Sequence, residues 1–214
     1  MPDFTLQPAN TLIVGMTGSG KTTFVNTYLI NDTSAACRFI FDDLNRMWPR
    51  LKLSPCYTEK QLEDSLATRW SAFNPLRAFG GDTKAAFKWW CRWVFHCASR
   101  GPGKKLVVVP ELWRHCTEDS IPQELALLAQ AGRELNVELV LDTQRPEAIN
   151  PSITGQSTEL VCFRLMSNEA LRAVEKLWRD CGVVCVRERV SALPLGSFYA
   201  WNRLSGGSLA GRVF

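Results

Sequence analysis

The chain has 214 residues, of which 46% are hydrophobic and 21% are charged. This composition excludes a mainly disordered protein, and the length is that of one large α/β domain. The 25 Lys and Arg against 21 Asp and Glu give a formal charge of +4, which permits a nucleic-acid partner without requiring one. No stretch approaches the roughly 18 apolar residues of a membrane span, and the amino terminus lacks a secretory pattern, so we expect a soluble protein made in a cytoplasm.

Short apolar runs alternate with helical stretches along the chain. Strands are expected at 11–14, 37–41, 106–109, 137–141 and 159–163, with a short edge strand at 196–199. Helices are expected from the end of the first loop to about residue 30, and at 58–72, 82–98, 123–134 and 168–181. This order predicts one α/β domain over 1–204, with a mostly parallel central sheet and helices on both faces. The Gly-Gly-Ser segment predicts a mobile tail at 205–214.

The segment GMTGSGKT at 15–22 matches the phosphate-loop pattern GxxxxGK[ST], between a predicted strand and a predicted helix. Glycines let successive N–H groups face inward, where they and the positive helix end hold a β-phosphate. Lys21 adds a charge at the β- and γ-phosphates, and the Thr22 hydroxyl coordinates Mg²⁺. The sequence therefore predicts binding of ATP and Mg²⁺. The predicted binding residues are Gly15, Met16, Thr17, Gly18, Ser19, Gly20, Lys21, Thr22 and Thr23.

Hydrolysis also needs a group that orients water and groups that stabilise charge at the γ-phosphate. Glu111 follows the strand at 106–109 and could polarise that water, although an exposed loop acid is the alternative. Gln144 ends the strand beside the phosphate loop and could contact the γ-phosphate. Arg133 lies at the end of the helix predicted at 123–134 and could act as a finger toward a neighbouring subunit, or merely cap the helix.

Four features in this order resemble the HerA–FtsK superfamily of nucleic-acid-pumping ATPases. They are GMTGSGKT, the strand ending in Glu111, Gly132-Arg133 and Thr143-Gln144-Arg145-Pro146. The resemblance implies a RecA-like sheet, hexameric rings, Arg133 acting in trans, Gln144 as sensor and double-stranded DNA in a central channel. The sequence departs from the family at Pro110, where an Asp usually holds the Mg²⁺ shell. Asp142 or Asp42 could substitute for it.

Large members of that family carry membrane anchors, clamp domains or winged-helix tails, and this chain shows none of them. It therefore resembles the small genome-packaging ATPases of tectivirus-like, tailless, membrane-containing viruses. The resemblance implies an ATPase that pumps double-stranded DNA into a preformed capsid. A viral portal or membrane protein would anchor the ring, in the host cytoplasm or at a virion vertex.

Two other functions remain open. Pro110 in place of Asp would suit a non-motor nucleotide-binding switch or virion assembly factor. A small-molecule phosphotransferase also shares the phosphate loop, although the Gly132-Arg133 and 143–146 segments argue against it.

The helix expected at 82–98 carries two further features. One is a group of aromatic residues: Phe87, Trp89, Trp90, Trp93 and Phe95. They could stack on bases. A place in the core or in a subunit interface is favoured, because aromatic residues are abundant in both. On the same helix a basic stripe of Lys84, Lys88 and Arg92 could follow phosphates or form a solvated face.

The cysteines contain no CxxC pair, which favours free buried thiols over disulfides. They are Cys37, Cys56, Cys91, Cys97, Cys116, Cys162, Cys181 and Cys185. A zinc site built from His96-Cys97 and His115-Cys116 is the alternative, although the spacing does not match a zinc motif.

Overall fold

The computed structural model describes residues 10–45, 47, 51–132, 134–179 and 183–214. In these ranges the strands form one eight-stranded sheet with the order β3-β2-β4-β5-β1-β6-β7-β8. The strands from β3 to β6 pair in parallel, and β7 and β8 are added antiparallel. The strands are β1 Thr11–Val14, β2 Ala35–Phe41, β3 Trp70–Phe73, β4 Lys104–Val109, β5 Val137–Thr143, β6 Glu159–Phe163, β7 Ser197–Asn202 and β8 Ser208–Arg212.

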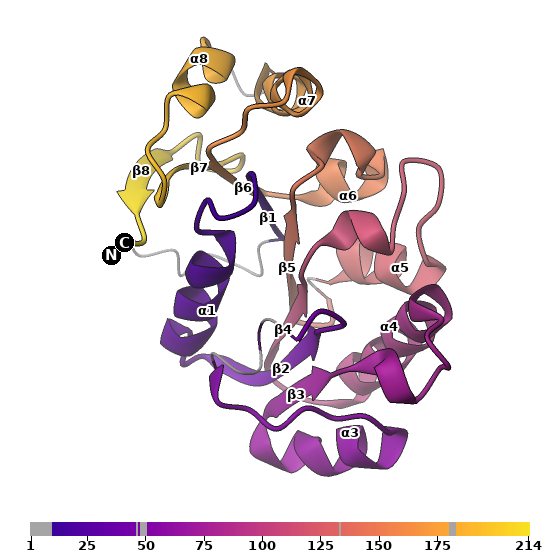
Figure 1. The fold of residues 1–214 in the computed structure, drawn as a ribbon. Coiled ribbons are helices and arrows are strands. Elements are labelled where there is room, and N and C mark those ends of the chain that lie inside the picture. The colour runs from indigo at the N-terminus through magenta and orange to yellow at the C-terminus, as the bar shows by residue number, and fades with distance from the viewer. Residues whose placement is uncertain (1–9, 46, 48–50, 133, 180–182) are drawn as a thin grey trace.

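Helices cover both faces of this sheet, which confirms the predicted α/β class. In Figure 1, α1 lies on one face and α4, α5 and α6 lie on the other. The helices are α1 Lys21–Asn31, α3 Glu59–Ser65, α4 Thr83–Arg100, α5 Gln123–Ala131, α6 Pro151–Gln156, α7 Asn168–Arg179 and α8 Val186–Ser191. Single 3-10 turns are η1 Leu66–Thr68, η2 Pro75–Arg77, η3 Leu112–Arg114 and η4 Pro146–Ala148. None of the helices in the described ranges is long and apolar enough to cross a membrane.

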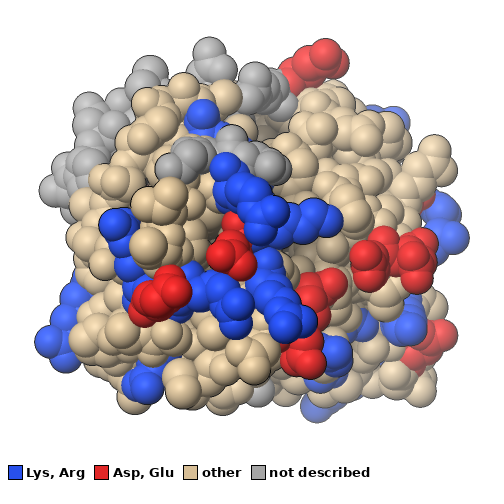
Figure 2. Space-filling view, turned by 90° about the horizontal axis from the view of Figure 1, so that it is seen from above, with Lys and Arg blue, Asp and Glu red and all other residues tan. Residues whose placement is uncertain are grey.

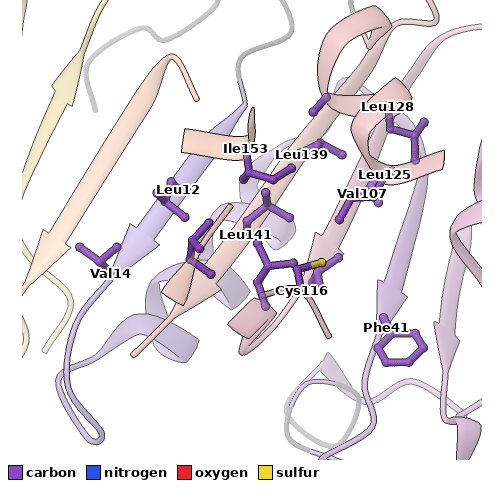
Figure 3. Packing of buried hydrophobic residues seen from close by; sticks show 14 of the residues in the cluster. Leu12, Val14, Phe41, Val107, Cys116, Leu125, Leu128, Leu139, Leu141 and Ile153 are labelled. Atoms are coloured by element: carbon purple, nitrogen blue, oxygen red, sulfur yellow. The ribbon is translucent and has the colours of Figure 1, made fainter. Parts of the chain in front are cut away.

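Two apolar clusters, one on each face of the sheet, hold the layers together. There are two because successive strand residues point to opposite faces. Ile13 packs in the same cluster as Val25 and Leu29 of α1, while its neighbours Leu12 and Val14 join the cluster on the opposite face. Figure 3 shows the second cluster, where side chains of β1, β4 and β5 meet those of α5 and α6. A strand buried on both faces reads as a continuous apolar run, which is the pattern of 11–14 and 106–109.

Helix α4 begins at Thr83 because the Asp82 carboxylate accepts a hydrogen bond from the Ala85 amide at 2.9 Å. Its Phe87 and Trp90 side chains are fully buried, which confirms the core interpretation for these two aromatics. Lys84, Lys88 and Arg92 lie on the exposed face of α4, so the basic stripe is at the surface.

The structure corrects the helix predicted at 58–72. Helix α3 ends at Ser65, and after η1 the residue Arg69 adopts φ 65°, which stops helical continuation. Trp70–Phe73 then pair with Arg38–Phe41 of β2 as a parallel edge strand. Four residues are too few for apolar periodicity to separate a strand from the end of a helix.

The structure also differs from the expectation at 196–214. β7 lies between β6 and β8, so it is not an edge strand. Residues Ser208–Arg212, expected in a mobile tail, pair with Ser197–Trp201 of β7. The Gly-Gly-Ser segment instead closes a hairpin, in which the Gly206 amide donates to the Asn202 carbonyl at 2.9 Å and Gly206 adopts φ 67°.

Candidate nucleotide-binding site

The phosphate loop connects β1 to α1 and is held by the strands on either side of β1. The Gly15 amide donates to the Thr143 carbonyl at 3.2 Å, and the Met16 amide donates to the Arg164 carbonyl at 2.8 Å. Gly20 caps α1 at φ 113°. A β-carbon at Gly15 would lie 2.6 Å from Cβ of Phe163, so the loop starts where only glycine fits. The end of β5 and the residue after β6 therefore fix the position of this loop.

Lys21 is the first residue of α1, and it is only 6% exposed. Its Nζ donates to the carbonyls of Gly15 at 2.8 Å and Met16 at 3.2 Å, so the ammonium group lies within the curve of the loop. The first amides of a helix have no partner within the helix and carry partial positive charge. This combination of an ammonium group and a helix start is suited to a bound phosphate.

Glu111 is connected to this loop through a series of side-chain hydrogen bonds. The Thr17 hydroxyl donates to Gln144 Oε1 at 2.5 Å, and Gln144 Nε2 in turn donates to Glu111 Oε1. The second carboxylate oxygen of Glu111 accepts from Trp113 Nε1 at 3.0 Å. The structure thus brings together an acid, an amide and the phosphate loop, which come from positions far apart in the sequence.

Pro110 and Glu111 form a buried turn between β4 and η3. Glu111 adopts φ 49° and ψ 49°, and its amide donates to Asp142 Oδ1 at 3.1 Å. Asp142 is on β5, which lies between β4 and β1. This is a suitable place for a carboxylate that replaces the Asp absent at Pro110. Asp42 instead follows β2 and accepts from the Met47 amide at 2.8 Å. Asp142 thus contacts the Glu111 segment directly.

A second acid, Asp43, connects the end of β2 to η3. Arg114 Nε and Nη2 donate to Asp43 Oδ2 at 3.3 and 3.2 Å, and His115 Nε2 lies 3.6 Å from the same oxygen. Burial alone would raise the pKa of Asp43, but His115 and Arg114 outweigh it and hold this pKa below its ordinary value. This brace fixes the segment that follows Glu111. No spacing in the sequence predicts the contacts of Asp43 with Arg114 and His115. The hydrogen bond from Trp113 to Glu111 could not be predicted from the sequence either.

Arg133 lies outside the described residues. Its neighbour Gly132 ends α5, and the Gly132 carbonyl accepts from the Val137 amide at 2.7 Å. The described residues contain no cluster of three or more His, Cys, Asp or Glu side chains that could hold a metal ion, so they give no support to the zinc alternative.

Comparison with known proteins gives one sequence relative and several solved structures of the same fold. No family model matches the chain. Protein P9 of Pseudoalteromonas phage PM2 is 28% identical over 174 residues, covering 80% of this chain and 76% of P9.

The genome packaging NTPase B204 of Sulfolobus turreted icosahedral virus 2, in complex with ATP-gammaS, superposes with a TM-score of 0.75 at 18% identity. The match covers 96% of this chain and 98% of B204. VirB4 of Thermoanaerobacter pseudethanolicus gives a TM-score of 0.72 at 11% identity over 96% of this chain and 89% of VirB4. The phosphate loop and the arrangement of strands around it therefore belong to a protein with the P-loop NTPase fold.

Proposed function

We propose that this protein is an ATPase that pumps double-stranded DNA, and that it packages a viral genome into a preformed capsid. The observation that carries the proposal is the hydrogen-bonded series from Thr17 through Gln144 to Glu111. It joins the phosphate loop to a buried acid through a strand-end amide, which would place a water-orienting group and a γ-phosphate sensor beside bound ATP. The likeness to the genome packaging NTPase B204 supports the same function.

Each residue of the proposed site has one task in this reaction. The loop amides and Lys21 would hold the β- and γ-phosphates of ATP, and the Thr22 hydroxyl would coordinate Mg²⁺. Asp142 would support the water shell of Mg²⁺ in place of the acid that Pro110 replaces. Glu111 orients the attacking water. Gln144 senses the loss of the γ-phosphate and transmits the change to β5.

We propose that Arg133 acts in a neighbouring subunit of a homo-hexameric ring. The phosphate loop contacts Thr143 at the end of β5, whereas Gly132 contacts Val137 at its beginning. Six steps along a strand correspond to about 20 Å. Gly132, which precedes Arg133 in the chain, is therefore well removed from the phosphate loop of its own chain, and this supports action in trans.

DNA would be held through its phosphates by exposed basic side chains. The stripe of Lys84, Lys88 and Arg92 on α4 is one candidate, although Arg92 also pairs with Glu124 at 3.0 Å. Figure 2 shows the end of the molecule that carries α7 and α8 in Figure 1, where basic and acidic side chains lie interspersed. A portal or membrane protein at the virion vertex would anchor the ring.

The deciding measurement is ATP turnover with and without linear double-stranded DNA, at low and at moderate salt. Lys21→Ala provides the blank, because it removes the ammonium group from the loop. We expect DNA to stimulate turnover and the stimulation to fade as salt rises, since phosphate contacts release counterions. Turnover that DNA leaves unchanged would contradict the proposal.

Pro110 favours one second function. Because proline supplies no carboxylate to the metal's water shell, the chain could bind nucleotide without hydrolysing it and act as a switch in virion assembly. Tight ATP binding with turnover no higher than that of Lys21→Ala, in the presence of DNA, would select this function over the motor.

A further inference from the structure

The phosphate loop has a neighbour on the side away from Glu111. Glu111 and Gln144 follow β4 and β5, on one side of β1, whereas β6, β7 and β8 lie on the other side. From that second side the Gly196 amide, just before β7, donates to the Ser19 carbonyl at 3.0 Å. The loop is therefore placed between the buried acid and the segment that leads into β7.

The two residues after β8 complete this second side. The Val213 amide donates to the Gly196 carbonyl at 2.8 Å. A β-carbon on Gly20 would lie 2.8 Å from Cγ2 of Val213, and one on Gly196 would lie 2.8 Å from Cε2 of Phe214. The residues that follow β8 thus pack directly against the phosphate loop, and the Phe214 ring lies against the α-carbon of Gly196.

Phe214 is nevertheless 59% exposed. It is the only Phe, Trp or Tyr in the described ranges that belongs to the exposed class, while the other described aromatics are buried or partly buried. Burial is the usual fate of such a ring, so an open ring beside a ligand-binding loop has an apolar face available for a ligand.

The direction of a bound triphosphate follows from the two sides of the loop. Its γ-phosphate must face Glu111 if this acid orients water. The α-phosphate and the nucleoside then leave on the other side, toward Gly196 and Phe214. We propose that Phe214 stacks on the adenine base of ATP. This contact would make the protein bind ATP more tightly than a phosphate chain without a base. This inference rests on the proposed function, in that the loop must bind ATP.

The test compares ATP with inorganic tripolyphosphate, which has the same phosphate chain but no base, by titration calorimetry of the full chain. Because stacking of a base on an aromatic ring contributes at least about 1 kcal/mol, Phe214→Ala should weaken ATP binding about five- to tenfold. Its affinity for tripolyphosphate should stay as in the unmodified chain. Phe214→Leu, which keeps apolar contact with Gly196, should behave like Phe214→Ala, and Phe214→Trp should retain ATP affinity.

Equal losses for ATP and tripolyphosphate would overturn the inference, because Phe214 would then only support the loop. Unchanged ATP binding in Phe214→Ala would overturn it as well. If the unmodified chain bound neither ligand, the inference and the proposed ATPase would fall together. A base-dependent effect of Phe214 without DNA-stimulated turnover would support the inference and remove only the motor.

Discussion

Glu111 occupies a left-handed backbone conformation that side-chain-bearing residues rarely adopt. Such a conformation costs on the order of 1–3 kcal/mol and persists only where neighbours enforce it. Here the Glu111 amide is held by Asp142, and its carboxylate is held by Gln144 and Trp113. The turn after Pro110 thereby directs a buried acid toward the phosphate loop.

Replacing Glu111 with Gln keeps the size of the side chain and removes its basicity. If Glu111 orients the attacking water, Glu111→Gln should lower turnover by roughly a hundredfold or more, while the Kd for ATP changes less than about threefold. Turnover assays and nucleotide titration measure the two quantities. Glu118→Gln, at an exposed acid, is the matched control. Turnover within a factor of two of the unmodified chain would remove Glu111 from the proposed mechanism.

Among the elements, β2 and η3 are joined by the contact of Asp43 with Arg114 and His115. The folded protein holds the pKa of Asp43 below its ordinary value of 3.8. A carboxylate with a lowered pKa stabilises the folded state above that ordinary value, and this contribution is lost as the pH falls through the folded pKa. The brace should therefore contribute to stability at neutral pH and weaken in acid.

Asp43→Asn should lower the free energy of unfolding by about 1–2 kcal/mol at about pH 7, because Asn has no charge to offer Arg114. At about pH 3 the difference from the unmodified chain should shrink, because below the ordinary value of 3.8 the Asp43 carboxyl takes up a proton first in the unfolded chain. Urea unfolding at both pH values measures this, with the exposed Asp64→Asn as control. A difference of the same size at both pH values would show that Asp43 acts through packing and not through charge.

The elements that could be predicted from the sequence are those with a long or distinctive pattern. The phosphate loop and the strands at 11–14 and 106–109 were predicted in place, because glycine spacing and continuous apolar runs are local signals. β3 and β8 were missed, since a four-residue edge strand and a Gly-Gly-Ser hairpin carry little pattern of their own. The acid, the amide and the loop were predicted separately. Their hydrogen bonds and the brace at Asp43 depend on the order of strands in the sheet, which no local pattern encodes.

At the scale of the whole molecule, the proposed ring predicts that two inactive variants complement each other. Arg133→Ala alone should bind ATP nearly normally and lose turnover by about a thousandfold or more. Mixed with Lys21→Ala, it should regain turnover well above the sum of the two separate samples. Some interfaces would then combine the intact loop of one subunit with the intact arginine of the next. Turnover measured across mixing ratios tests this, and a flat response would place Arg133 in its own subunit's site or outside catalysis.

The central position of β1 has a consequence for how the protein is made. β1 is the first strand of the described residues, yet its neighbours β5 and β6 follow more than a hundred residues later, and the loop after it is held by Thr143 and Arg164. During synthesis the phosphate loop leaves the ribosome long before its supports exist. Nascent chains that stop short of Arg164 should therefore be unable to retain ATP, so the nucleotide site matures late in translation.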